Sequence, residues 1–149
     1  MRLPPKRDLA FVGAQVALFV ALAIDPFPLA VRVNPWLGGV GIALCIASIV
    51  FGVVAVVQLG TNLTPWPSPK ASSQLVTTGT YALARHPIYA SLLVFGLGLS
   101  LWTLSPWRLV VSAALYGLFR AKARYEEGLL QARYPSYAVY RDQVKRFGW

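Results

Sequence analysis

Four apolar stretches dominate the pattern of hydrophobic and polar positions along the chain. They cover residues 9–24, 36–59, 88–104 and 107–124. A helix that crosses a bilayer needs about 20 mostly apolar residues, and three stretches reach or approach that length without a charge. The apolar part of the fourth, 107–119, is too short to cross alone, so we expect its helix to run on through residue 124 and to continue to about Arg133, before Pro135. The pattern predicts an all-α membrane protein with about four transmembrane helices.

Between and after these stretches lie two segments of mixed character. A long loop occupies residues 60–87, and a C-terminal segment occupies residues 125–149, with a short helix expected over 136–146. The whole chain, 1–149, is read as one membrane domain. The first stretch has an alternative interpretation as a cleavable signal peptide, because bases precede it and Ala21-Leu22-Ala23 ends it.

Composition supports a membrane protein. Hydrophobic residues make up 56% of the chain and charged residues 13%, against roughly 25% charged in an average soluble domain. This excludes an ordinary soluble globule, and it excludes intrinsic disorder, which requires low hydrophobicity. Cys45 is the single cysteine, so we expect neither a disulfide framework nor a cysteine-based metal site.

The net charge of +9 indicates orientation. With four spans, twelve of the fourteen bases fall on one side, and only Arg32 and Arg108 fall on the other. Bases accumulate in cytoplasmic loops, so we expect both termini in the cytoplasm and the chain in an inner or plasma membrane. A nucleic-acid partner is the weaker explanation of the basic, tyrosine-rich C-terminal segment, which also suits a membrane surface.

Polar chemistry is concentrated in three places. The loop 60–87 is long enough to be functional, although it could be a rigid connector. The run Arg85-His86-Pro87-Ile88-Tyr89 places the chain's one histidine at a helix start, where backbone N–H groups favour an anion. Its alternative role is an interfacial anchor. The adjacent Glu126 and Glu127 could bind a polar ligand, or could form a solvated helix face with Lys122.

These features resemble, in this order, the integral membrane methyltransferases related to isoprenylcysteine carboxyl methyltransferase and the phospholipid methyltransferases. The matching runs are Leu75–Tyr81, Arg85–Tyr89, Glu126–Leu130 and Tyr134–Tyr140. Together they extend over about residues 58–147. Arg-His-Pro-x-Tyr alone is a weak signal, but with the upstream Gly-x-Tyr and the downstream Glu-Glu it is fairly specific.

The resemblance implies a cytoplasmic pocket for S-adenosylmethionine, closed by the C-terminal segment, with a lipid-side tunnel for the methyl acceptor. It implies cofactor binding by Gln74, Leu75, Val76, Tyr81, Arg85, His86, Pro87, Tyr89 and Glu127. It implies catalytic roles near the reaction centre for Arg120, Glu126 and Glu127, where Arg120 lies two turns before Glu127 on nearly one helix face. No metal is implied.

The acceptor is expected to be a lipid or isoprenoid. Methylation of a carboxylate oxygen is favoured, and N-methylation of a phospholipid amine is the alternative. Two functions of other classes stay open, a four-span small-molecule transporter and a non-catalytic membrane subunit. An ion-coupled transporter would be expected to place an acid inside a span, whereas every Asp and Glu here lies at the end of a stretch or outside it.

Overall fold

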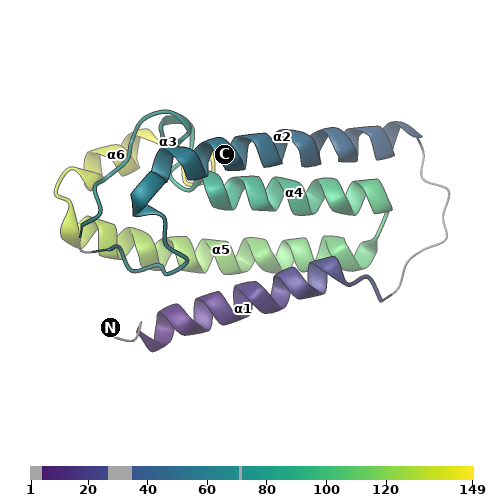
Figure 1. Ribbon diagram of the computed structural model, residues 1–149, viewed down its shortest axis with the longest axis horizontal. Coiled ribbons are helices and arrows are strands. Elements are labelled where there is room, and N and C mark those ends of the chain that lie inside the picture. The colour runs from purple at the N-terminus through teal and green to yellow at the C-terminus, as the bar shows by residue number, and fades with distance from the viewer. Residues whose placement is uncertain (1–4, 27–34, 71) are drawn as a thin grey trace.

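The four predicted long helices are present in the computed structural model, which describes residues 5–26, 35–70 and 72–149. In chain order the elements are α1 (Lys6–Ala23), α2 (Pro35–Leu59), the short 3-10 helix η1 (Gly60–Asn62), α3 (Thr80–Leu83), α4 (Pro87–Thr103), α5 (Pro106–Arg133) and α6 (Tyr137–Gln143). Figure 1 shows α1, α2, α4 and α5 as an elongated bundle, with α3, α6 and the loop after α2 gathered at one end. The all-α prediction is confirmed.

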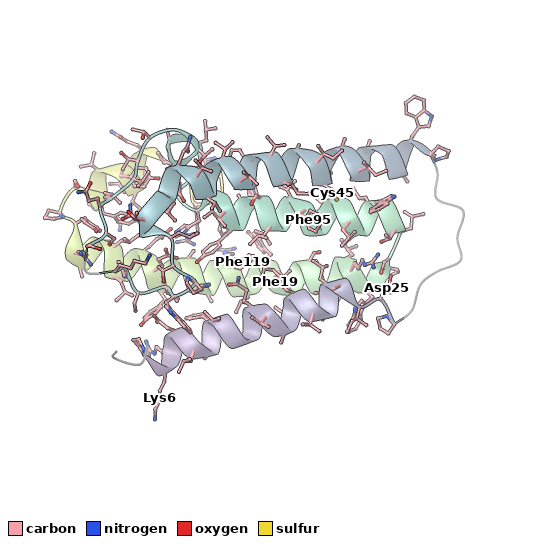
Figure 2. The ribbon with its side chains drawn as sticks, in the orientation of Figure 1. Lys6, Phe19, Asp25, Cys45, Phe95 and Phe119 are labelled. Atoms are coloured by element: carbon pink, nitrogen blue, oxygen red, sulfur yellow. The ribbon has the colours of Figure 1, made fainter. Side chains whose placement is uncertain are left out.

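Helices α2 and α4 approach each other very closely because glycines line their contact. A Cβ on Gly98 would lie 2.8 Å from the Gly41 carbonyl oxygen and 3.0 Å from the Cys45 backbone nitrogen. Backbones can come this near only where side chains are absent. Cys45 Sγ lies 3.7 Å from the Phe95 carbonyl oxygen across the same contact, as Figure 2 illustrates. This packing fixes α4 and the residues at its start against α2.

Helix α1 packs along α5 on the other side of the bundle. Phe19 and Phe119 meet edge to face with ring centroids 6.4 Å apart, and Figure 2 shows both between the two helices. At the C-terminal end of α1, Trp107 Nε1 donates to the carbonyls of Ala21 and Ile24, at 2.8 and 2.9 Å. The indole therefore satisfies carbonyls that the end of α1 leaves without helical partners.

Helix α5 continues to Arg133, as the sequence predicted, and so carries Glu126 and Glu127 beyond the fourth apolar stretch. The final helix is shorter than expected: it ends at Gln143 rather than Arg146, and Val144 is extended. The reason is a contact with residues distant in sequence. The carbonyls of residues 141, 144, 145 and 146 accept hydrogen bonds from residues 85 and 86, and a longer helix would turn the last of these carbonyls toward its own N–H groups.

One helix among the described residues is long and apolar enough to cross a membrane by length and composition. It runs from residue 35 to residue 62 with a mean hydropathy of 2.9 over its most apolar window. α4 is apolar but has 17 residues. The four-span topology and its orientation therefore stay predictions, and Arg32, on which the charge count partly rests, lies outside the described residues.

Candidate active site

The turn before α3 places the site residues that follow it. Gly79 has φ 64°, and a Cβ there would lie 2.4 Å from the Gln58 side-chain amide. Gln58 Oε1 accepts from the Thr80 backbone N–H at 2.8 Å and from its hydroxyl at 2.7 Å. Glycine is needed both for the left-handed conformation and for the space. The loop is thereby fastened to the end of α2, and Tyr81, Arg85 and His86 are positioned from it.

His86 stands at the start of α4, as predicted, with Pro87 in the first turn. Its imidazole is buried and stacks on the Tyr89 ring, with centroids 5.3 Å apart and planes within 1°. Tyr89 in turn stacks on Phe119, at 4.8 Å. Three parallel rings, two from α4's start and one from α5, therefore hold the histidine in one orientation.

Glu127 lies behind His86 and is fully engaged in ion pairs. Its carboxylate accepts from Arg85 Nη2 at 3.0 Å, from His86 Nε2 at 3.2 Å and from Arg146 Nη2 at 2.7 Å. Burial acts to raise the pKa of Glu127, but the hydrogen bonds from Arg146 and His86 and the nearby Arg85 charge outweigh it and hold the pKa well below its usual value. Glu127 is therefore ionised, and His86 Nε2 must carry the proton that it donates.

The remaining donors of Arg85 face backbone rather than solvent. Nη1 donates to the carbonyls of Arg141 and Val144, and the N–H groups of Arg85 and His86 donate to the carbonyls of Lys145 and Arg146 at 3.0 and 2.9 Å. Residues 144–149 are called the C-terminal tail below. Arg85, Glu127 and Arg146 hold this tail over the start of α4. Neither the Arg85 guanidinium nor the N–H groups of Arg85 and His86 are therefore open to an anion.

Glu126 has a different environment from its neighbour. Oε2 accepts from the Tyr89 hydroxyl at 2.9 Å and lies 3.8 Å from His86 Nδ1, and 26% of its side-chain surface is accessible because it faces a cavity. Burial raises the pKa of Glu126, while His86, the Tyr89 hydrogen bond and Lys122 act in the opposite direction. Of the two glutamates, Glu126 is the one that can meet a ligand.

The cavity has a volume of about 380 Å³, which is within the usual range for small-molecule sites. It lies between the 60–76 loop, the starts of α3 and α4, and the inner faces of α5 and α6. Its polar or aromatic lining includes Gln15, Asn62, Ser73, Gln74, Tyr81, Arg85, His86, Tyr89, Lys122, Glu126, Tyr134, Tyr137 and Tyr140. The predicted residues Leu75, Val76 and Pro87 line it as well.

Tyr134, at the end of α5, and Tyr140, in α6, join this C-terminal region to the loop and to α3. Tyr134 Oη donates to the Ser73 carbonyl at 2.5 Å, and Tyr140 Oη donates to the Tyr81 carbonyl at 2.5 Å. Burial of the Tyr140 hydroxyl raises its pKa to about 12. Tyr137 differs, because its buried hydroxyl has no hydrogen-bond partner among the described residues. Because Tyr137 also lines the cavity, a polar ligand there is a candidate partner for this hydroxyl.

Comparison with known proteins identifies the family. The model of the phospholipid methyltransferase family matches residues 37–136, about two thirds of the chain. The chain belongs to that family. The matched range includes the 60–76 loop, His86 and the two glutamates, but α1 lies outside it.

Relatives of this phospholipid methyltransferase family member have varied names. Protein-S-isoprenylcysteine O-methyltransferase of Tribolium castaneum is 26% identical over 94% of this chain and 50% of its own length. The cobalt-zinc-cadmium resistance protein CzcN of Cupriavidus metallidurans is 28% identical over 84% of this chain and 67% of its own. The nickel-cobalt-cadmium resistance protein NccN of Alcaligenes xylosoxydans is 33% identical over 54% and 38%. The chain spans half the length of the Tribolium relative.

A solved structure has the same fold. The eukaryotic intramembrane Ras methyltransferase ICMT, isoprenylcysteine carboxyl methyltransferase, matches with a TM-score of 0.73 over 96% of this chain and 53% of that one, at 24% identity. The resemblance seen in the sequence is thus confirmed at the level of family and fold.

Two expectations about site residues change with the geometry. Arg120 was expected to look into a cleft with Glu127, but it is exposed and lies outside the cavity lining, with its guanidinium 5.8 Å from the Tyr116 ring. At 3.6 residues per turn Arg120 and Glu127 do share a face of α5, but Lys122 and Glu126, which line the cavity, lie about 100° or more around the helix from that face. Glu127 is likewise outside the lining. Contact of Arg120 and Glu127 with the cofactor or the acceptor stays a prediction, and neither residue lines the cavity of this protein.

Sequence reasoning assigned two of the lining residues to exposed surfaces. Lys122 was read as half of a solvated pair with Glu126, yet it is 2% exposed and donates to Gln15 Oε1 at 2.7 Å. Tyr137 was counted among the aromatics of a membrane-surface helix, yet it is 1% exposed. The signal for Lys122 was available: counted at 3.6 residues per turn, it shares a face with Glu126 and Phe119, and both face inward.

Proposed function

We propose that the protein transfers a methyl group from S-adenosylmethionine to a lipid or isoprenoid acceptor at the membrane. Family membership supports the reaction class. The observation that carries the proposal is the cavity, in which Glu126, His86 and Tyr89 form one hydrogen-bonded and stacked group. We place the cavity at the cytoplasmic end of a four-span bundle, in accord with the distribution of bases.

The lining fits the cofactor chemically. S-adenosylmethionine carries a sulfonium, an ammonium, a carboxylate, ribose hydroxyls and an adenine ring. Glu126 suits the ammonium or the ribose, tyrosine faces suit a cation and an aromatic base, and the unpartnered Tyr137 hydroxyl offers a hydrogen bond. Gln74, Leu75, Val76 and Tyr81 line the loop side, where the adenosine would be held. When bound, the cofactor supplies a methyl group on a positively charged sulfur, which leaves as a neutral thioether.

The side chains act mainly by positioning, since methyl transfer needs the acceptor atom in line with the methyl group. The ring stack of His86, Tyr89 and Phe119 fixes Glu126 through the Tyr89 hydroxyl. A carboxylate acceptor forms its O–CH₃ bond without losing a proton. An amine acceptor must release a proton, and Glu126 or His86 Nδ1 could accept it. We favour the carboxylate, with the phospholipid amine as the alternative.

Other functions receive less support. The names of CzcN and NccN concern metal resistance, but within residues 5–26, 35–70 and 72–149 no three His, Cys, Asp or Glu side chains are arranged to hold a metal ion. A transporter or a non-catalytic subunit would need neither the Glu126 arrangement nor the unpartnered Tyr137 hydroxyl. We therefore propose the enzyme.

The test is direct. Purified protein in a neutral detergent is titrated with S-adenosylhomocysteine by calorimetry, and total lipid extract is incubated with methyl-labelled S-adenosylmethionine before mass spectrometry of the lipids. We expect saturable binding and a labelled lipid. Folded protein that binds no cofactor at millimolar concentration would contradict the proposal. His86→Ala, which removes one end of the ring stack, serves as the inactive control.

A further inference from the structure

Lys122 is a buried cation that the proposed chemistry has not used. The residue is 2% exposed, and its Nζ donates to Gln15 Oε1 at 2.7 Å and to the Pro65 carbonyl at 3.3 Å. Nζ also lies 5.3 Å from the Tyr89 ring centroid. These partners are neutral. Among the ion pairs found between described residues, none includes Lys122.

A buried ammonium without a carboxylate at contact distance is unfavourable in the free protein, because water has been removed and no ion pair at contact distance replaces it. An ammonium has three N–H donors, and two are used here, so one is left for a ligand. Lys122 lines the cavity. Two acids, Glu126 and Asp8, act on it from beyond contact distance. Glu126 accepts from Tyr89, and Asp8 accepts from the Ser68 N–H through Oδ2, while Asp8 Oδ1 has no hydrogen-bond partner among the described residues.

The cavity adjoins an apolar groove. This groove has a volume of about 310 Å³ and lies between α2 and α4. Its lining is Ser48, Ile49, Gly52, Val53, Val56, Val57, Ile88, Ser91, Leu92 and Phe95. Ile88 and Leu92 line both spaces. A hydrocarbon chain in the groove would therefore bring its head group into the cavity beside Tyr89, the ring over which Lys122 lies.

Depth along α5 separates the two charged groups of the cavity. Lys122 precedes Glu126 by four residues, about 6 Å along the helix axis. Glu126 contacts Tyr89 and His86 at the start of α4, whereas Lys122 contacts Gln15 and the Pro65 carbonyl. Its partner Gln15 comes from α1, which lies outside the residues that the family model matches. Recognition at this point thus depends on α1 as well as on α5.

We propose that Lys122, held by Gln15, is an anion-binding subsite for the head group of the acceptor, whose single hydrocarbon chain lies in the α2–α4 groove. The proposal rests on the proposed function and narrows it: the subsite selects an anionic head group, such as a carboxylate, over an ammonium. Gln15 is a positioning residue, because it orients the ammonium and does not itself carry the charge that is recognised.

The experiment compares three probes with one chain length and different heads. Oleate, oleyl alcohol and oleylamine are titrated into protein in maltoside detergent with saturating S-adenosylhomocysteine at about pH 8.5, and dissociation constants are taken from tryptophan fluorescence. We expect oleate to bind at least about tenfold tighter than the other two, since a charge-assisted hydrogen bond contributes on that scale.

Three variants and a control isolate the subsite. Lys122→Met and Gln15→Glu should weaken oleate binding about 10- to 100-fold and leave oleyl alcohol unchanged. Gln15→Leu should weaken oleate binding by less. Gln143→Glu adds the same charge at an exposed position of α6 and should change nothing. The melting temperature of each variant without ligand verifies folding.

Two results would overturn the subsite: equal affinity of the wild-type protein for oleate and oleyl alcohol, or unchanged oleate binding by folded Lys122→Met. Calorimetry with S-adenosylhomocysteine on the same samples distinguishes this failure from that of the proposed function. Cofactor binding without a head-group preference rejects the subsite alone. A head-group preference without cofactor binding supports the subsite and rejects the methyltransferase.

Discussion

Arg146 and Glu127 form a two-point ion pair, with Nη2 to Oε2 at 2.7 Å and Nε to Oε1 at 2.9 Å. Because Glu127 belongs to α5 and Arg146 to the C-terminal tail, residues 144–149, the pair joins this tail to the helix that carries Glu126. It also explains why two adjacent glutamates differ: one is neutralised by cations, and the other faces the cavity.

The two glutamates should therefore respond oppositely to isosteric neutralisation. Glu127→Gln breaks a buried ion-pair group, which costs about 3 kcal/mol, and should lower the melting temperature at neutral pH by about 5–10 °C. Glu126→Gln removes a charge whose burial is unfavourable, and should leave the melting temperature unchanged or slightly higher. Differential scanning fluorimetry in detergent measures both. Equal losses in the two variants would contradict this assignment.

Acid should remove the stabilisation by Glu127. The pKa of Glu127 in the folded protein lies below its ordinary value of 4.5, so its contribution is complete above that pH and is lost as the pH falls toward the folded pKa. The gap in melting temperature between wild type and Glu127→Gln should stay constant from neutral pH to about pH 5 and narrow below it. A gap that widens on acidification would have the wrong sign.

Activity should depend more directly on Glu126. Glu126→Gln keeps the shape but loses the ionic contact with cofactor or acceptor, and we expect about a 10- to 100-fold loss of kcat/KM without loss of folding. Tyr89→Phe removes the hydroxyl that holds Glu126 and should give a smaller loss. Label transfer from S-adenosylmethionine to lipid extract provides the measurement. The exposed Asp142→Asn is the matched control, and it should retain full activity.

Packing between α2 and α4 should be intolerant of a single methyl group. In Gly98→Ala the new Cβ would lie 2.8 Å from the Gly41 carbonyl oxygen, so the helices must separate, at a cost of about 1–3 kcal/mol. Gly117→Ala on α5 meets nothing within 4 Å and should be neutral or stabilising by up to about 1 kcal/mol. Melting temperatures of the two variants test the contact, and similar values would show that it is not tight.

The sequence was sufficient to predict the elements and less so the burial of charge. Apolar stretches and proline stops predicted the long helices, and the extension of α5 to Arg133 followed from a span too short to cross alone. The position of His86 at a helix start followed from Pro87. These features depend on neighbours in the chain, so periodicity and capping rules reach them.

The partners of the charged residues depend on contacts distant in sequence. Arg85 was assigned to a cofactor anion, but its donors meet Glu127 and carbonyls more than 40 residues away. Lys122 was paired with Glu126 by an i,i+4 rule that describes exposed helices, whereas Gln15, its actual partner, lies 107 residues away. No local pattern encodes such contacts, because they depend on how α1 and the C-terminal tail pack on α5.

Tyr137 provides a test in which free and bound protein should respond with opposite sign. Its hydroxyl is buried without a partner among the described residues, which costs about 1 kcal/mol or more in the free protein. Tyr137→Phe should therefore raise the melting temperature without ligand by about 2–4 °C. If a bound cofactor supplies the missing hydrogen bond, the same variant should bind S-adenosylhomocysteine about tenfold more weakly, so that saturating ligand stabilises it less than wild type.

Tyr134→Phe is the control for Tyr137→Phe. The Tyr134 hydroxyl already has partners in Ser73, so its removal should instead destabilise the free protein. A Tyr137→Phe variant that melts lower than wild type without ligand would mean that the hydroxyl is already satisfied, and would remove this tyrosine from the cofactor site.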